Sequence, residues 1–319
     1  MDYRIGVVGA GTHGTRYLRH ALNDVPGLTA TALQRRTVPK GEELARELDL
    51  RFHSQAAALI DDDQVDGVIV TTPPGSHHEL ARQVMAAGKP LLLEKPMTGT
   101  LAEAEDLAAH PASGTMMVAQ TLRWNPVIRK VKELWPRLGR VHHVRAAQRL
   151  EPTKLAWQRN PAETVTGSVL LTGVHIFDTV RYLTGQEFRE VDSRQQNILN
   201  PEAEDIFLAR ARLDDGCWVS MEVSKYTQSR ACWLEAVGEE GQLFADYLHQ
   251  GIILRQGTHQ EECDVSARVP TLPLVLTDWL AVIKGDRECP VSAEDGLATM
   301  RIVDACYRSA AEERSISLA

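Results

Sequence analysis

A glycine-rich turn near the start of the chain constrains the fold more than any other feature. The turn follows an apolar run, opens an amphipathic one, and consists of Gly9-Ala10-Gly11-Thr12-His13-Gly14. In such a turn the first glycine permits a tight bend, the second lets the backbone approach a pyrophosphate, and the third allows close packing of helix on strand. The N-terminus of the helix that follows attracts negative charge. The turn therefore predicts a strand, a dinucleotide-binding loop and a helix in succession.

Strand-like and helix-like segments alternate after this turn, which is typical of βαβ units. Strands are predicted at residues 4–8, 28–34, 67–71 and 90–94, and helices at 12–23 and 42–48. The strands are nearly continuous in apolar residues, as expected of parallel strands covered on both faces. Residues 1–121 are therefore predicted to form a Rossmann domain of the α/β class, in which ligands bind at the carboxyl ends of the strands.

Three further helix starts have recognisable capping sequences. They are Ser76 with Glu79, Thr100 with Glu103, and Asn125 before Pro126. The helix after Ser76 is predicted to end at Gly88, because glycine relieves the left-handed conformation that follows many helices.

Beyond residue 122 the apolar pattern changes to the alternation of half-buried strands. Strands are predicted at 141–148, 206–213 and 217–223, with a hairpin at Asp214-Asp215-Gly216. A separate α+β domain spanning residues 122–319 is therefore expected.

Composition narrows the class of partner. The 319 residues carry a net charge of -8 and no long basic run, which argues against nucleic acid and anionic membranes because both require positive charge. No signal peptide or membrane-spanning segment is recognisable, so a cytoplasmic location is expected. The five cysteines form no C-x-x-C pair, which argues against disulfides and a metal site. A small-molecule partner is the remaining expectation.

The residues after the second predicted strand indicate which dinucleotide is bound. An acidic side chain there usually binds the ribose of NAD, whereas arginine accommodates the 2′-phosphate of NADP. This chain has Gln34, Arg35 and Arg36 at that point. The sequence therefore favours NADP over NAD, the alternative being that both arginines belong to a solvated loop.

A lysine follows the strand at 90–94, within Glu94-Lys95-Pro96. An ammonium group at the end of this strand could donate a hydrogen bond to a substrate oxygen and stabilise negative charge that develops there. Lys95 is therefore a candidate catalytic residue. The alternative is a surface lysine paired with Glu94.

A second candidate lies in the later domain, where Gly173-Val174-His175 opens a helix expected to run to Gly185. His175 and Asp178 are three residues apart on this helix, so the carboxylate could orient the imidazole. A histidine near neutral pKa is suited to exchanging a proton with an alcohol or carbonyl. The alternative is a structural histidine.

Together these segments resemble the Gfo/Idh/MocA family of oxidoreductases, named after glucose-fructose oxidoreductase, inositol dehydrogenase and a rhizopine-catabolism protein. The resemblance spans nearly the whole chain. It rests on the glycine turn, Thr72-Pro73-Pro74-Gly75-Ser76-His77 with Glu79, Gly88-Lys89-Pro90, Glu94-Lys95-Pro96, Arg123-Trp124-Asn125-Pro126, Gly173-Val174-His175 with Asp178, and Val291-Ser292-Ala293-Glu294-Asp295-Gly296.

The resemblance implies a second domain with a large open, mostly antiparallel sheet that mediates assembly into a homodimer or homotetramer. It implies hydride transfer between a nicotinamide and a sugar, polyol or related carbonyl compound, with Lys95 and His175 as the catalytic pair. His77 matches a histidine on the nicotinamide side of the cofactor site. Beyond the glycine turn with Thr12 and His13, we expect Thr72, Pro73 and Glu94 to contribute to the cofactor site. We expect the substrate site to include Arg123, Asn125, Trp157, Thr172 and His175, with Trp157 chosen because a tryptophan face can stack on a sugar ring or on the nicotinamide.

One position departs from the family pattern. Many members have an aspartate four residues before the catalytic histidine, and this chain has Leu171 there. Leucine can neither accept a hydrogen bond nor relay a proton. Besides a sugar or polyol oxidoreductase, two alternatives therefore remain: a dinucleotide-binding sensor or partner subunit without activity, and a reductase of a less polar substrate.

Overall fold

The computed structural model describes residues 2–152, 167–265 and 269–318. Contacts divide the chain into two compact units, Met1–Thr121 with Pro270–Leu297, and Leu122–Val269 with Ala298–Ala319. The initial segment of the first unit ends at Thr121. A later segment, 270–297, packs with it as well.

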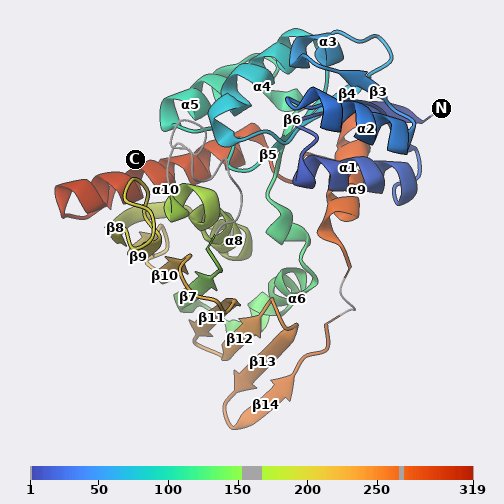
Figure 1. Ribbon diagram of the computed structural model, residues 1–319. Coiled ribbons are helices and arrows are strands. Elements are labelled where there is room, and N and C mark those ends of the chain that lie inside the picture. The colour runs from blue at the N-terminus through green and yellow to red at the C-terminus, as the bar shows by residue number, and fades with distance from the viewer. Residues whose placement is uncertain (1, 153–166, 266–268, 319) are drawn as a thin grey trace. The chain divides into compact units, whose positions relative to one another are not determined.

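The first unit is built on a six-stranded parallel sheet in the order β3-β2-β1-β4-β5-β6, which confirms the predicted Rossmann architecture. Its strands are β1 (Tyr3–Val8), β2 (Leu28–Gln34), β3 (Arg51–His53), β4 (Gly67–Val70), β5 (Leu91–Glu94) and β6 (Met116–Ala119). Its helices are α1 (Thr12–Asn23), α2 (Val38–Leu48), α3 (Ala56–Ile60), α4 (His77–Ala86), α5 (Leu101–Ala109) and α9 (Thr271–Ile283). Figure 1 shows α3, α4 and α5 together on one face of this sheet and α1, α2 and α9 on the other.

Two helix boundaries of this unit follow the local sequence. The Thr100 side chain accepts from the Glu103 backbone N–H while the Glu103 carboxylate accepts from the Thr100 N–H, so the predicted capping box at α5 is confirmed. Gly88 follows α4 with φ +68, and the N–H groups of Gly88 and Lys89 bond to the carbonyls of Met85 and Val84. This is the Schellman pattern, which supports the predicted helix end.

The capping box predicted at Ser76 is wrong. Residues Pro74–Ser76 form a 3-10 turn, and Ser76 has a helical backbone at φ -111 and ψ -1. Its hydroxyl donates to Thr72 Oγ1 at 2.8 Å and to the Pro73 carbonyl at 3.0 Å. A residue already inside a turn cannot direct its side chain at the N–H groups ahead of it as an extended N-cap does.

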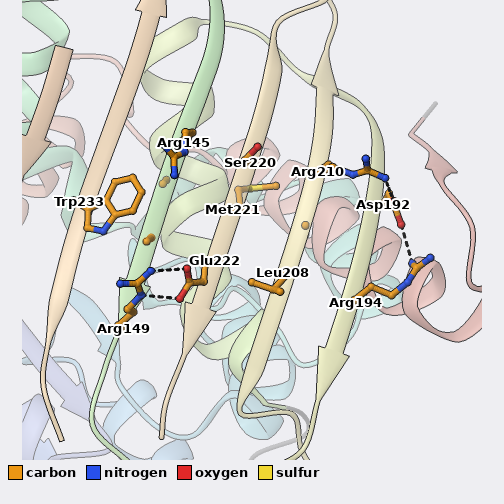
Figure 2. A pocket seen from close by; sticks show the side chains of 13 residues that line it. Arg145, Arg149, Asp192, Arg194, Leu208, Arg210, Ser220, Met221, Glu222 and Trp233 are labelled. Atoms are coloured by element: carbon orange, nitrogen blue, oxygen red, sulfur yellow. Dashed lines mark hydrogen bonds and ion pairs between the residues drawn. The ribbon is translucent and has the colours of Figure 1, made fainter. Parts of the chain in front are cut away.

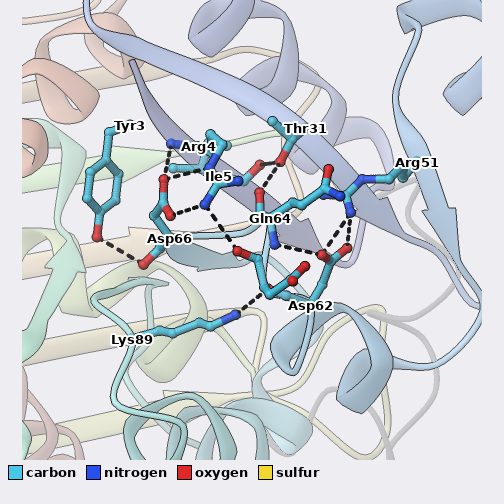
Figure 3. A network of polar contacts seen from close by, with 10 residues as sticks. Tyr3, Arg4, Ile5, Thr31, Arg51, Asp62, Gln64, Asp66 and Lys89 are labelled. Carbon is cyan, nitrogen blue, oxygen red and sulfur yellow. Dashed lines mark hydrogen bonds and ion pairs between the residues drawn. The ribbon is translucent and has the colours of Figure 1, made fainter. Parts of the chain in front are cut away.

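A polar network lies at the amino end of β1, opposite the carboxyl ends of the strands (Figure 3). Asp66 accepts from the Arg4 backbone N–H at 2.9 Å and from the Arg4 guanidinium at 2.6 Å. The Arg4 hydrogen bond holds the pKa of Asp66 below its ordinary value, against the effect of burial. Lys89, just before β5, donates to the Asp62 carbonyl at 2.7 Å. The polar side chains at this end of the sheet thus bind one another and stabilise the fold.

The second unit contains a nine-stranded sheet in the order β14-β13-β12-β11-β7-β10-β9-β8-β15. Its strands are β7 (Val141–Arg149), β8 (Phe188–Gln196), β9 (Ile206–Leu213), β10 (Trp218–Ser224), β11 (Ala231–Gly238), β12 (Gln242–Asp246), β13 (Gly251–Gln256), β14 (His259–Glu262) and β15 (Ile316–Ser317). β7 and β10 are parallel and the other neighbours are antiparallel. The expected open, mostly antiparallel sheet is confirmed.

Helices α6 (Pro126–Leu134) and α8 (Val174–Thr184) pack on one face of this sheet. Asn125 caps α6 as predicted, because its Oδ1 accepts from the Val127 N–H at 2.9 Å. A π-helical turn, Val169–Gly173, leads into α8, which ends before Gly185 at φ +69. The helix α10 (Ala293–Glu312) begins in the first unit and ends in the second.

Among the helices described, none combines the length and the apolar character needed to cross a bilayer. The cysteines are free thiols. Within the described ranges, no group of histidine, cysteine and acidic side chains is arranged to hold a metal ion.

Candidate functional site

The glycine turn between β1 and α1 has the geometry of a dinucleotide cradle. Gly9 has φ +89, and a Cβ there would lie 2.8 Å from Thr72 Cγ2. A Cβ on Gly14 would lie 2.6 Å from both the Gly9 carbonyl oxygen and Thr71 Oγ1. At Gly11 the nearest atom would be the Gly9 oxygen at 3.9 Å. The protein thus constrains the first and third glycines and leaves space beside the second, which fits a pyrophosphate approaching the backbone of Thr12 and its neighbours.

Gln34 lies at the carboxyl end of β2 and supports the turn. The backbone carbonyl of Gln34 accepts from the N–H groups of Gly9 and Ala10 at 3.1 and 2.8 Å. Its side-chain Oε1 accepts from the Gly9 N–H at 3.2 Å, and its Nε2 donates to the Ser54 carbonyl at 3.3 Å. Gln34 therefore holds the glycine turn in place.

The two arginines that follow are accessible. Arg35 is half-buried and Arg36 exposed, in the loop between β2 and α2. Both are thus placed next to the Gln34 position, where a 2′-phosphate on the ribose would need a cation.

The loops after β4 and β5 are held together by His77. Its imidazole is fully buried, with Nε2 2.8 Å from the Thr72 carbonyl and Nδ1 2.8 Å from the Pro96 carbonyl. Burial lowers the pKa of His77, and the two carbonyls oppose that shift. Thr72 and Pro73 are half-buried on the loop that this histidine supports.

Glu94, the last residue of β5, is the centre of a buried cluster. Its Oε1 lies 2.7 Å from His13 Nε2 and accepts from the Tyr17 hydroxyl at 2.7 Å, while Oε2 accepts from the Lys95 backbone N–H at 3.1 Å. Burial alone would raise the pKa of Glu94, but the hydrogen bonds from His13 and Tyr17 hold that pKa below its ordinary value. Glu94 thereby links the glycine turn, through His13, to the end of β5.

Lys95 follows immediately and is only partly exposed. Burial lowers the pKa of its ammonium group, and the charge of Glu94 opposes the shift. An ammonium group with a lowered pKa gives up its proton more readily than a surface lysine does. This environment differs from the surface ion pair that was the alternative interpretation of Lys95.

In the second unit, Arg123 and Asp178 form a buried ion pair that the sequence reasoning missed. Arg123 Nε donates to Asp178 Oδ2 at 2.9 Å and its Nη2 to Oδ1 at 2.7 Å, and Asp178 is 1% exposed. The guanidinium also stacks over the Tyr182 ring at 5.5 Å. Arg123, expected in the substrate wall, thus anchors α8 to the segment before α6.

His175 stands in the first turn of α8, half-buried, three residues before Asp178. Leu171 and Thr172 are buried in the π-helical turn that precedes it. Asn125 caps α6 and its Nδ2 approaches the Tyr247 carbonyl at 3.5 Å. These candidates belong to the second unit and the cofactor candidates to the first, while Trp157 lies outside the described residues.

A second contact missed from sequence fixes the start of the helix that carries His175. Glu204 accepts from the N–H groups of Gly167 and Val169 at 3.2 and 2.8 Å and from the Tyr307 hydroxyl at 2.9 Å. Burial raises the pKa of Glu204, and these hydrogen bonds oppose the shift. No local pattern relates residues so far apart in the chain.

The sheet face opposite α6 and α8 carries ionic and aromatic side chains (Figure 2). Arg149 binds Glu222 at 2.7 Å, and Arg194 and Arg210 bind the two carboxylate oxygens of Asp192 at 2.8 and 2.6 Å. Large apolar side chains also remain accessible here, with Leu208 51% and Trp218 50% exposed.

Comparison with known proteins covers both units. A family model described as an oxidoreductase family with an NAD-binding Rossmann fold matches residues 3–120, and its companion, described as a C-terminal alpha/beta domain, matches residues 136–318. The chain is 26% identical to inositol 2-dehydrogenase 1 of Saccharopolyspora erythraea, over 97% of this chain and 94% of the relative. It is 27% identical to the scyllo-inositol 2-dehydrogenase (NADP(+)) IolW of Bacillus subtilis, over 99% and 96%.

Among solved structures, the fold is similar to that of an aldose-aldose oxidoreductase from Caulobacter crescentus complexed with glycerol. The TM-score is 0.90 at 23% identity, with 100% of both chains covered.

Proposed function

Because this chain belongs to the Gfo/Idh/MocA family of NAD(P)-binding oxidoreductases, we propose that it transfers a hydride between a nicotinamide and a sugar-like or polyol substrate. The observation that carries the proposal is the hydrogen bond between His13 and Glu94. It joins the dinucleotide cradle to the strand end that bears Lys95. The relatives named inositol dehydrogenases support the substrate class.

In this proposal, the side chains of the protein transfer a proton to or from the reacting oxygen and stabilise the charge on it. The nicotinamide, when bound, supplies or accepts the hydride at C4. Lys95 donates a hydrogen bond to the substrate oxygen and stabilises the negative charge that develops on it. In the oxidative direction His175 takes the hydroxyl proton, and in the reductive direction it returns one.

We propose NADP as the preferred cofactor. Gln34 brings no negative charge to the ribose position, and Arg35 and Arg36 follow it in an accessible loop. A 2′-phosphate there would be attracted by two guanidinium groups that can bind it bidentately. The relative named as an NADP(+) enzyme supports this preference.

We also propose that a second copy of the chain covers the open sheet face. The face combines paired arginine and acidic side chains with the accessible Leu208 and Trp218. A two-fold axis brings the same face of both copies together, and a face that carries both signs of charge does not repel its copy. A homodimer, or a tetramer built from two, is the expected assembly.

The test is a panel of sugars, inositols, other polyols and apolar carbonyl compounds, assayed in both directions with each of the four nicotinamide cofactors. Turnover with a polyol or sugar supports the proposal. Turnover restricted to apolar carbonyls would instead support the reductase alternative, which the buried Leu171 favours. Cofactor binding without turnover on any compound would reject hydride transfer and support a sensor or partner subunit.

A further inference from the structure

The cluster around Glu94 contains a titratable group that the proposed hydride transfer does not use. His13 is 42% exposed at its side chain, whereas Glu94 is 9% exposed, so the imidazole forms the accessible side of this pair. The ring of His13 also packs edge-on against Tyr17 at 5.3 Å. The Tyr17 hydroxyl and the Lys95 N–H complete the donors around the carboxylate. The imidazole is therefore held in place by a buried anion.

The position of this pair along a bound dinucleotide follows from the strand order. β4 separates β1 from β5, while Gln34 at the end of β2 stands on the opposite side of the glycine turn. In this fold the residue at the end of β2 binds the adenosine ribose, so the nicotinamide half extends from the turn across β4 and β5. The backbone of His13 lies in the glycine turn, and its side chain contacts Glu94 at the end of β5. A dinucleotide bound in this orientation would therefore have its nicotinamide half beside His13.

The charge of the pair depends on one proton. Hydrogen bonds keep Glu94 ionised despite its burial, so the pair carries one negative charge when His13 is neutral and none when His13 is protonated. Histidine is the side chain that changes charge around neutral pH. A nicotinamide ring is cationic when oxidised and neutral when reduced. Only the oxidised ring gains from a negative neighbour.

We propose that His13 and Glu94 form a protonation-dependent selector between oxidised and reduced cofactor. This inference rests on the proposed dinucleotide function. With His13 neutral, the pair attracts the oxidised ring. Proton uptake by His13 cancels that attraction and shifts the preference toward the reduced cofactor. Glu94 supplies the charge, and Tyr17 is a positioning residue that acts through Glu94.

Other charged groups near the pair do not explain the same behaviour. Burial and the Glu94 charge raise the pKa of Tyr17 well above its ordinary value, so Tyr17 stays neutral. Arg16 on α1 lies near Tyr17 and is unchanged in a His13 variant. Lys95 follows the cluster, and His77 on α4 is buried between two carbonyls. Because Lys95 and His77 remain in a His13 variant, the difference between that variant and the wild type isolates His13.

The experiment measures dissociation constants, without turnover. NADP⁺, NADPH, NAD⁺ and NADH are titrated by fluorescence or calorimetry from about pH 8.5 to about pH 5.5, the range in which histidines titrate. In the wild type, the ratio of the oxidised to the reduced dissociation constant should rise about tenfold as the pH falls, as expected for one nearby charge in a partly screened site. The ratio should be flat in His13→Asn.

Two variants sharpen the test. His20→Asn is the matched control, because His20 lies on the same helix and pairs with Asp24 at 2.6 Å, away from the turn. It should keep the wild-type slope. Glu94→Gln, if its circular dichroism shows a folded protein, should flatten the slope and weaken NADP⁺ more than NADPH.

Calorimetry in two buffers of different ionisation enthalpy gives an independent readout. NADP⁺ should release protons from the wild type on binding and NADPH should not. A wild-type ratio that is flat with pH, or an unchanged slope in His13→Asn, overturns the selector even when both cofactors bind. Failure of all four dinucleotides to bind at every pH rejects the proposed function itself.

Discussion

At the scale of single residues, the pKa shifts of Glu94 and Lys95 have different causes: hydrogen bonds outweigh burial at Glu94, whereas burial outweighs the neighbouring charge at Lys95. Glu94 is offered hydrogen bonds by His13, Tyr17 and the Lys95 N–H, and its pKa falls below the ordinary value. Burial lowers the pKa of Lys95, and the Glu94 charge only partly offsets this. The hydrogen-bond donors around the Glu94 carboxylate account for this difference between the two residues, since hydrogen bonds to a charged form stabilise it. An ionised acid is thus placed next to a lysine that can release its proton.

Replacement of Lys95 by methionine tests the catalytic assignment. Lys95→Met should lower turnover by roughly a hundredfold or more, because a group that stabilises the developing charge is lost. The dissociation constant of the cofactor, measured by fluorescence, should change little. Lys89→Met is the matched control, since Lys89 precedes the same strand at its opposite end and donates to the Asp62 carbonyl. Full turnover in Lys95→Met would refute the role.

The double replacement Arg35→Ala with Arg36→Ala tests the cofactor preference. Loss of charge-assisted hydrogen bonds to a 2′-phosphate should weaken NADPH roughly tenfold or more, whereas NADH, which lacks that phosphate, should change little. Binding of both cofactors is measured side by side, with the exposed Arg46→Ala as a control for the loss of one surface cation. Equal weakening of NADPH and NADH would show that the arginines do not read the phosphate.

Residues with local roles could be predicted from the sequence, and those with distant partners could not. The glycine turn, the Asn125 cap and Gly88 act on backbone within a few residues, so their spacing carries the information. The sequence suggests His175 as the neighbour of Asp178, but the Asp178 carboxylate accepts hydrogen bonds from Arg123, 55 residues away. Such pairs depend on how the elements pack.

At the scale of elements, the same capping chemistry begins a helix in each unit. Asn125→Ala and Thr100→Ala each remove side-chain acceptors from the first turn and should cost about 1 kcal/mol of unfolding free energy. Lys130→Ala is the control on α6. Lys130 forms a surface ion pair with Glu133 at 3.1 Å, and such exposed pairs typically contribute about 0.3–0.5 kcal/mol to stability. Urea unfolding measures all three. A cost at the caps no larger than at Lys130 would contradict the cap assignment.

The stability that Glu204 gives to the start of the π-helical turn should depend on pH. Glu204→Gln leaves at least one donor unsatisfied and should cost about 1–3 kcal/mol. The folded pKa of Glu204 lies above its ordinary 4.5, so the folded state binds the proton more tightly than the unfolded state. That contribution to stability is complete below 4.5 and is lost as the pH rises through the raised pKa.

Because glutamine does not titrate, the cost of Glu204→Gln should shrink as the pH rises. Urea unfolding at a series of pH values measures it, with the exposed Glu202→Gln as the control. A cost that grows with rising pH would mean that the folded protein favours the ionised carboxylate.

At the scale of the whole molecule, the order of helices and strands along the chain does not show which of them belong to which compact unit. Both sheets follow from sequence patterns, since buried parallel strands and half-exposed antiparallel strands have different periodicities. The helix α9 comes after strands β7 to β14 of the second sheet, yet it packs on α1 in the first unit. Its apolar sequence predicts burial without indicating which sheet it covers.

The open sheet face makes the assembly testable by one substitution. Leu208 is 51% exposed on this face, at the position in β9 that pairs with Glu222 of β10 and Arg194 of β8. In a two-fold interface Leu208→Glu would bury an added carboxylate beside Glu222, while the neighbouring Arg194 is already paired with Asp192. The cost should be several kcal/mol, roughly the scale of an uncompensated charge. The protein should therefore dissociate to monomers in light scattering at micromolar concentration.

Leu199→Glu provides the matched control, because Leu199 is 57% exposed in the loop after β8 and lies off the sheet face. The same added charge at similar exposure should leave the molar mass unchanged. If the wild type is monomeric, or if Leu208→Glu keeps the wild-type mass, the face is not the contact between copies. If both variants dissociate equally, net charge controls association, and the paired arginines and acids of the sheet do not specify it.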